Sequence, residues 1–171
     1  SLVSRLFTAR PVGDREPALD LLWQRVSDRY PVAVVRNAEQ IRRRLSSHPS
    51  VCYHRWLISP RFSSSPVAFV AFRTDGGVCR WVELVWDARH PGALELLARL
   101  AARLAAEGAA EYEELWLNSD PQGVAKLEAL GFERRPEPNQ LVMVARSFSP
   151  ELDVNDLDGR VYVTMADADL V

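Results

Sequence analysis

The stretch that decides the fold is VCRWVELVW (78–86), followed directly by DARHPGALELLARLAARLAAEG (87–108). The first part is rich in Val and Trp and predicts a strand. A short loop with one Pro and one Gly then leads into a helical pattern of apolar residues, which Gly108 is expected to end as its C′ residue. The start of a helix presents free backbone N–H groups and the positive end of its dipole. This strand–loop–helix unit therefore predicts a place where a phosphate group can bind.

Two helices are expected before this unit. The first has Pro17 in its first turn and closes at Pro31, because proline suits the start of a helix and restricts the residue before it. The second begins at Asn37, a residue type that caps helices, with Gln40 three positions on as a variant of the capping box. It is expected to run to about Ser47.

Strands are expected on both sides of the unit, at 4–12, 50–59, 63–74, 112–118 and 139–148, with a further extended piece at 160–165. The turn DGG (75–77) joins two of them, so three consecutive strands form an antiparallel meander. A helix over 120–130 follows the strand at 112–118, with Asp120 as its N-cap and proline in its first turn.

This order of elements predicts the α/β class. We expect a mixed, mostly antiparallel twisted sheet of about six to seven strands, with helices on both faces. With 171 residues the chain fits one domain, 1–171, with an extended C-terminal tail over 150–171.

Composition excludes several classes of partner. Hydrophobic residues make up 47% of the chain, enough for a sizeable core, and the net charge is −2 at pH 7, whereas a nucleic-acid binder shows a basic excess. The most apolar run, PVAFVAF (66–72), has the length of a strand, not of a membrane span, and the N-terminus carries Arg where a signal peptide would be apolar. We expect a cytoplasmic protein that binds neither nucleic acid nor membrane.

Cysteine and histidine usage predicts no metal site. Cys52 and Cys79 lie in predicted strands without metal or redox spacing, and we expect both to be buried free thiols. His48, His54 and His90 are far apart and lack ligand spacing. We therefore expect no metal cofactor.

The element order and two local motifs resemble the GNAT family, the acetyl-CoA-dependent N-acetyltransferases. DPQGVAKLEALGFERR (120–135) is similar to a family helix and its exit through a Gly-Phe pair, and 78–118 looks like the family's fourth strand, third helix and fifth strand. The segments RYPVAVVRNAEQIRRRLSSHP (29–49) and YVTMADADLV (162–171) resemble a subgroup often built as tandem copies. The resemblance covers nearly the whole chain and implies acetyl-CoA as co-substrate.

The resemblance places the family's pyrophosphate loop, Q/R-x-x-G-x-G/A, before the long helix in one of two registers. Its three motif positions are held by Ala88, Pro91 and Ala93 or, one residue on, by Arg89, Gly92 and Leu94. Only the last position fits in the first register, and only the first two fit in the second. The proline lacks an N–H in either case. The candidate phosphate-binding residues are Arg89, Gly92 and Ala93.

The resemblance also implies where the rest of the cofactor lies. The pantetheine arm would run between the strands at 78–86 and 112–118, paired with backbone groups of Leu84, Val85 and Trp86, with Asn118 at the end of the second strand. An enzyme needs this cleft open to solvent. An inactive domain would fill it with side chains, and Trp86 and Trp116 are the expected plugs.

Acyl transfer to an amine needs proton transfers at two places. Glu83 lies on the strand at 78–86, is expected to point away from its neighbours Val82 and Leu84, and is the candidate base that takes the proton of the amine. Many family members protonate the CoA thiolate with a Tyr, and Leu127 holds that position here. A leucine cannot donate a proton.

Two functions of different class follow. The first is an acyl-CoA-dependent N-acyltransferase whose acceptor is a small-molecule amine, a protein N-terminus or a lysine. The alternative is a catalytically inactive GNAT-like domain with a structural or partner-binding role. Its partner would be a second copy in a homodimer or a tandem GNAT domain, bound through an apolar patch at LFTARPV (6–12) or the tail over 160–171.

Overall fold

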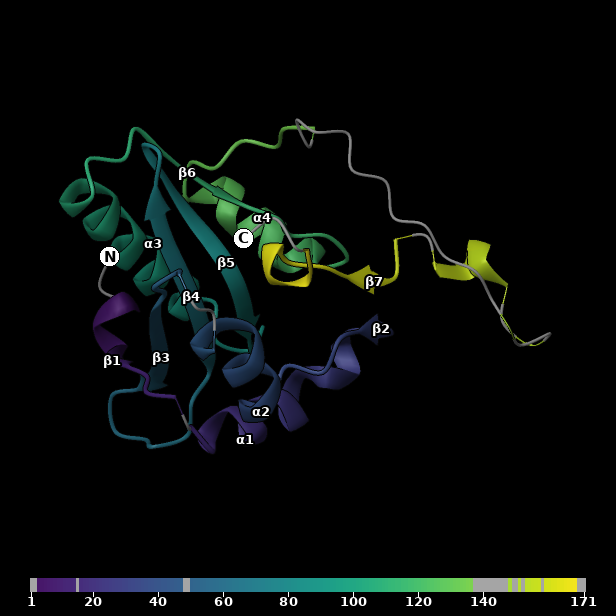
Figure 1. Cartoon of the computed structure of the whole chain (residues 1–171). Coiled ribbons are helices and arrows are strands. Elements are labelled where there is room, and N and C mark those ends of the chain that lie inside the picture. Colours follow the sequence, from purple (N-terminus) through teal and green to yellow (C-terminus); the bar gives the residue numbers. More distant parts are fainter. Residues whose placement is uncertain are drawn as a thin grey trace.

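The computed structural model describes residues 3–14, 16–47, 50–136, 148, 151, 153–157 and 159–168, without the side chains of residues 3 and 4. A five-stranded sheet in the order β1-β3-β4-β5-β6 lies at its centre (Figure 1). The strands are β1 (Phe7–Pro11), β3 (His54–Pro60), β4 (Ala68–Asp75), β5 (Val78–Trp86) and β6 (Tyr112–Leu115). The first four are antiparallel neighbours, and β6 runs parallel to β5.

Two short strands form a second, parallel pair, β2 (Val32–Ala33) with β7 (Val161–Tyr162). The mixed, mostly antiparallel sheet confirms the predicted α/β class. Of the extended piece predicted at 160–165, only two residues are strand. The strand predicted at 139–148 lies outside the described residues, apart from its last one.

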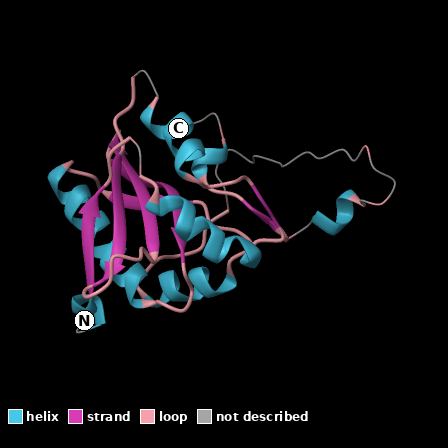
Figure 2. Ribbon diagram, turned by 90° about the horizontal axis from the view of Figure 1, so that it is seen from below, coloured by secondary structure: helices cyan, strands magenta, loops and turns pink. Residues whose placement is uncertain are grey.

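Helices cover both faces of the sheet (Figure 2). They are α1 (Ala18–Val26), α2 (Ala38–Ile41), which continues as a π-helical turn over Arg42–Ser46, α3 (Gly92–Glu107) and α4 (Pro121–Ala129). Short 3-10 turns cover Val3–Leu6, Ser27–Arg29, Val154–Leu157 and Met165–Asp167. None of the described helices is both long and apolar enough to cross a membrane.

The core has two halves, one on each face of the sheet. On one face α3 and Leu127 of α4 pack on strand residues such as Phe72 and Trp81, which we call the α3 core. On the other face α1 and α2 pack on residues such as Phe69 and Val85, together with Tyr162, Met165 and Ala166, which we call the α1 core. Thus part of the C-terminal tail is built into the α1 core.

Several local signals in the sequence are confirmed. The side chain of Asn37 accepts a hydrogen bond of 2.9 Å from the backbone N–H of Gln40, as a capping residue does. The DGG turn places Gly76 and Gly77 at φ of +54° and +78°, the left-handed values that a two-residue hairpin turn with the sheet's twist requires.

Other predictions are wrong in an instructive way. Cys52 is exposed and lies before β3, because the strand begins only at His54; Cys79 is buried, and both thiols are free. Gly108 ends α3 at an ordinary φ of −89°, not in the left-handed C′ conformation. Its role is spatial instead, since a Cβ there would lie 2.4 Å from Cγ2 of Thr74.

One irregularity decides where the candidate base points. The β4–β5 register shifts between Ala71 and Phe72, so that Ala71 pairs with Glu83 and Phe72 with Trp81. Val82 is the extra residue of this bulge, which re-aims the side chains around it. Glu83 therefore faces the α1 core together with Val82, and only Leu84 points to the opposite face. The expectation that Glu83 points away from both neighbours is wrong for Val82.

Candidate functional site

The candidate cleft begins where β5 and β6 stop pairing. The two strands pair from Val78 with Tyr112 to Trp81 with Leu115, and β5 then continues for five more residues without a β6 neighbour. A strand with a free edge presents unpaired backbone N–H and C=O groups. This edge of β5, residues 82–86, has no β6 neighbour, and we call it the open edge.

Side chains of the protein itself occupy the open edge. The hydroxyl of Tyr162 donates a hydrogen bond of 2.6 Å to the carbonyl of Leu84, and Arg29 donates one of 2.8 Å to the carbonyl of Trp86. The N–H of Leu84 donates to the carboxylate of Glu83 at 2.9 Å. The backbone groups predicted to hold pantetheine are thus partnered within the chain.

Trp86 and Asp120 form a second contact across the cleft. The indole N–H of Trp86 donates to Asp120 at 2.6 Å, and Arg29 pairs with the same carboxylate at 2.9 Å while its guanidinium lies 5.0 Å from the centre of the Trp86 ring. Asp120 also accepts from the backbone N–H of Gly123 at 3.0 Å, which confirms it as the N-cap of α4. Trp86 is 1% exposed and lies in the α3 core, whereas Trp116 is only partly buried, against the α1 core.

Glu83, the candidate base, lies in a buried ion pair. Its carboxylate is 3.0 Å from Nε of Arg36, and the two residues are 3% and 1% exposed. Arg36 also pairs with Asp167, and its guanidinium lies 4.7 Å from the centre of the Tyr162 ring. Burial raises the pKa of Glu83 above its ordinary value, against the opposing effect of Arg36.

The loop that leads into α3 gathers charge around one carboxylate. Asp87 is buried and accepts hydrogen bonds from the backbone N–H of Arg89 at 3.1 Å and from its guanidinium at 2.6 Å. Arg25 lies 3.8 Å away and His90 3.6 Å. Burial opposes the charge of Asp87, but the bonds from Arg89 outweigh it and lower the pKa of Asp87. The negative charge near the start of α3 is therefore supplied by the protein itself, by the carboxylate of Asp87.

The predicted phosphate-binding residues, Arg89, Gly92 and Ala93, lie together at the start of α3 and in the loop that leads into it. Gly92 opens α3, and the N–H of Ala93 donates to the carbonyl of His90 at 2.9 Å. Gly92 and Ala93 are both buried, whereas the side chain of Arg89 is 68% exposed. Asn118 lies apart from this loop, where its amide oxygen accepts the N–H of Val163 at 2.7 Å.

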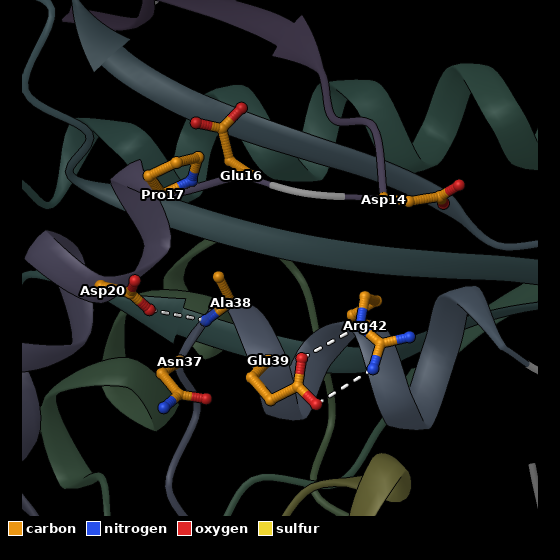
Figure 3. Close-up of a pocket in the computed structure, with 8 residues that line it drawn as sticks. All are labelled: Asp14, Glu16, Pro17, Asp20, Asn37, Ala38, Glu39 and Arg42. Carbon is orange, nitrogen blue, oxygen red and sulfur yellow. Dashed lines mark hydrogen bonds and ion pairs between the residues drawn. The ribbon is translucent and has the colours of Figure 1, made fainter.

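Two cavities accompany the site, and neither is lined by Glu83, Trp86, Arg89 or Gly92. One, of about 490 Å³, lies between the start of α1 and α2 and is rich in carboxylates (Figure 3). Its acids are already engaged: Asp20 accepts the N–H of Ala38, and Glu39 pairs with Arg42. The other, a groove of about 1280 Å³, runs along β6 and α4 to Asn118 and Val163.

Among the described residues, no three His, Cys, Asp or Glu side chains gather as a metal site would require.

Sequence reasoning did not single out four residues that shape this site, which are Arg25, Arg29, Arg36 and Tyr162. Each donates a hydrogen bond to a residue 40 or more positions away in the chain; Arg36, for example, donates to Glu83. No local pattern marks such contacts.

No family model and no curated protein sequence matches this chain. Solved structures do match it. The ribosomal-protein-S18-alanine N-acetyltransferase from Escherichia coli aligns with a TM-score of 0.53 at 15% identity, over 76% of this chain and 79% of that one. A tandem GNAT protein from the clavulanic acid biosynthesis pathway aligns with a TM-score of 0.57 at 18% identity, over 73% of this chain and 43% of its own length.

TM-scores of 0.53 and 0.57 over about three quarters of this chain show that its mixed α/β fold is that of the two neighbours. At identities of 15% and 18% the likeness concerns the fold and not individual residues. The chain has the fold of these GNAT proteins.

Proposed function

We propose that this chain is an acyl-CoA-dependent N-acyltransferase, which moves an acyl group such as acetyl from its CoA thioester to an amine. The observation that supports this most directly is the divergence of β5 from β6 beyond Trp81 and Leu115, which leaves the edge at 82–86 without a neighbouring strand. An extended, amide-containing ligand suits such an edge, because it adds to the sheet as a further strand does. The acyltransferase proposal is also supported by the two similar structures, because both are GNAT proteins.

In this proposal the cofactor is acetyl-CoA, held along the open edge and at the start of α3. Backbone groups of Leu84 and Trp86 would pair with pantetheine, whereas those of Val85 point to β4, and Asn118 would lie at the far side of the cleft. Arg89, Gly92 and Ala93 would take the pyrophosphate, since a helix start and an exposed guanidinium both favour negative charge. Arg89, Gly92 and Ala93 fit a pyrophosphate if the guanidinium of Arg89 leaves Asp87 and pairs with the phosphate instead.

Glu83 is proposed to take the proton of the acceptor amine. A carboxylate with a raised pKa is a stronger base than an exposed one, and burial moves the pKa of Glu83 in that direction. The neutral amine nitrogen attacks the thioester carbonyl, and the C–S bond breaks as the amide bond forms. CoA leaves as a thiolate that would take its proton from water, since Leu127 has none to donate. The acceptor would have to reach Glu83 on the face of β5 that packs against the α1 core. It would be a small-molecule amine, a protein N-terminus or a lysine.

A second candidate function is favoured by a specific observation, the occupation of the open edge by Tyr162 and Arg29. A non-catalytic GNAT-like domain needs no free cleft and is stabilised by filling it. Leu127, which lacks a hydroxyl group and is buried, agrees with this candidate. Such a domain would serve a second copy or a tandem partner domain.

Thermal unfolding with and without acetyl-CoA separates the two functions. A ligand at 100 times its Kd adds about 2.7 kcal/mol to the free energy of unfolding, which is several degrees in Tm for a chain of this size. The transferase proposal expects a rise with about millimolar acetyl-CoA and CoA but not with ATP, which carries phosphates without pantetheine. No shift with either CoA species would contradict it and leave the non-catalytic candidate.

A further inference from the structure

We propose that residues 159–168 act as an intramolecular plug, which covers the open edge of β5 and has to withdraw before an acyl-CoA binds there. This inference rests on the proposed function, because it concerns access to the same cleft. Figure 1 shows the segment in yellow, with β7 next to β2 and the short turn after it near β5. Its contacts reach both sides of the cleft.

The first side is β5. The hydroxyl of Tyr162 donates to the carbonyl of Leu84 at 2.6 Å, and its ring stacks on Tyr30 with the ring centres 4.0 Å apart. Consecutive carbonyls of a strand point to opposite edges, so those of Leu84 and Trp86 share one edge. Tyr162 therefore holds a carbonyl on the edge that a pantetheine amide would use.

The second side is the chain beyond β6. The amide oxygen of Asn118 accepts the N–H of Val163 at 2.7 Å. The hydroxyl of Ser119 reaches the carbonyl of Gly159 at 2.7 Å and that of Val161 at 3.0 Å. The segment is thus hydrogen-bonded to the end of β6 and to β5 at once, which closes the gap between the diverging strands.

The anchors of the segment differ in how deeply they are buried. Thr164 and Met165 belong to the buried part, where Arg36 also binds Asp167. The contacts of Ser119 lie at the surface or are only partly buried, and β7 pairs with β2 over just two residues. The end at residues 159–161 is held by few, shallow hydrogen bonds and opens locally without global unfolding. Release of Tyr162, which is 1% exposed, also opens part of the α1 core.

Competition between the segment and a ligand has a measurable consequence. If only the open form binds, the apparent Kd exceeds the intrinsic Kd by the inverse of the open fraction. Removing one hydrogen bond that exists only in the closed form raises that fraction by a factor of roughly 2 to 10. The apparent affinity for acetyl-CoA should then rise by the same factor.

The test compares three variants with the unchanged full chain. Tyr162→Phe removes the bond to Leu84 and keeps the ring in the core; Ser119→Ala removes the bonds to the tail from the other side. Ser63→Ala is the matched control, because Ser63 lies at the surface on the β3–β4 loop and its hydroxyl accepts a hydrogen bond from the N–H of Ser65. Acetyl-CoA affinity is measured by calorimetry, and hydrogen exchange at the N–H of Val163 reports the position of the tail.

The expected result is a roughly 2- to 10-fold lower Kd for acetyl-CoA in Tyr162→Phe and Ser119→Ala, no change in Ser63→Ala, and faster exchange at Val163 when acetyl-CoA binds. If the variants loosen the tail but bind acetyl-CoA no better than the unchanged chain, the plug is refuted and the transferase proposal stands. If no variant binds any CoA species although exchange at Val163 is fast, the transferase proposal fails.

Discussion

The hydroxyl of Tyr162 and the carbonyl of Leu84, 78 residues apart in the chain, meet in a hydrogen bond of 2.6 Å. This contact ties the C-terminal tail to the edge of β5 that has no β6 neighbour. Burial also raises the pKa of Tyr162 well above its ordinary value, so the phenol stays protonated and remains a donor throughout the physiological range. The cleft expected from the fold is therefore closed by a neutral hydrogen bond.

The buried pair of Arg36 and Glu83 should dominate the stability of this region. Arg36→Met removes the partner of a carboxylate that is 3% exposed and leaves its charge uncompensated. We expect a loss of about 3 to 5 kcal/mol in the free energy of unfolding, measured with urea. Arg43→Met is the control, because Arg43 pairs with Glu39 at the surface and should matter little. Equal losses in both variants would contradict this assignment.

The pH dependence of stability should reveal the state of Glu83. Its pKa in the folded chain is raised by burial, so its contribution is complete below the unfolded value of about 4.3 and is lost as the pH rises through the folded pKa. We expect the unchanged chain to lose stability relative to Glu83→Gln as the pH rises above about 4.3. Urea unfolding across this range checks it. A difference that grows in favour of the unchanged chain as the pH rises would show that Arg36 lowers the pKa instead.

Gly123 should tolerate no side chain, although it lies inside α4. A Cβ there would be 2.8 Å from a carboxylate oxygen of Asp120 and 3.0 Å from Cδ2 of Leu117. Alanine favours a helix by about 1 kcal/mol over glycine, but forcing an atom into a packed site costs about 1 to 3 kcal/mol. We expect Gly123→Ala to lower Tm. Gly13→Ala, which meets nothing within 4 Å, should leave Tm unchanged or raise it, and a matching loss there would undermine the explanation.

The two thiols should differ in reactivity. Cys52 is exposed, whereas Cys79 is buried and its pKa is raised by burial, which lowers the thiolate fraction. In the native chain one thiol should react rapidly with a disulfide reagent, and both should react after unfolding. The variant Cys52→Ser should then show no rapid reaction. Two rapidly reacting thiols in the native chain would mean that the α3 core opens around Cys79.

The elements that could be predicted are those with local causes. Asn37 and Asp120 cap helices through their own side chains, and Gly76 and Gly77 supply the left-handed backbone of a hairpin, so three or four residues of sequence suffice. The strand–loop–helix unit is visible for the same reason, since a period of two changes to a period of 3.6 within one short stretch.

The site is harder to predict because it depends on distant contacts. Arg36 meets Glu83 across 47 residues, and the direction of Glu83 depends on the bulge opposite Ala71 and Phe72, which leaves no trace in the alternation of its neighbours. Cys52 was assigned to a strand because propensity alone does not locate a strand's first residue. The roles predicted for Glu83, Asn118 and the loop before α3 remain predictions.

The central claim is that an acyl-CoA binds along the open edge of β5 and at the start of α3. Amide hydrogen exchange of the full chain, with and without saturating acetyl-CoA, tests it most directly. The account predicts slower exchange at Leu84 and Trp86 and at Gly92 and Ala93, together with faster exchange at Val163. Unchanged exchange at β5 and α3, or protection only at the acidic cavity between α1 and α2, would contradict it.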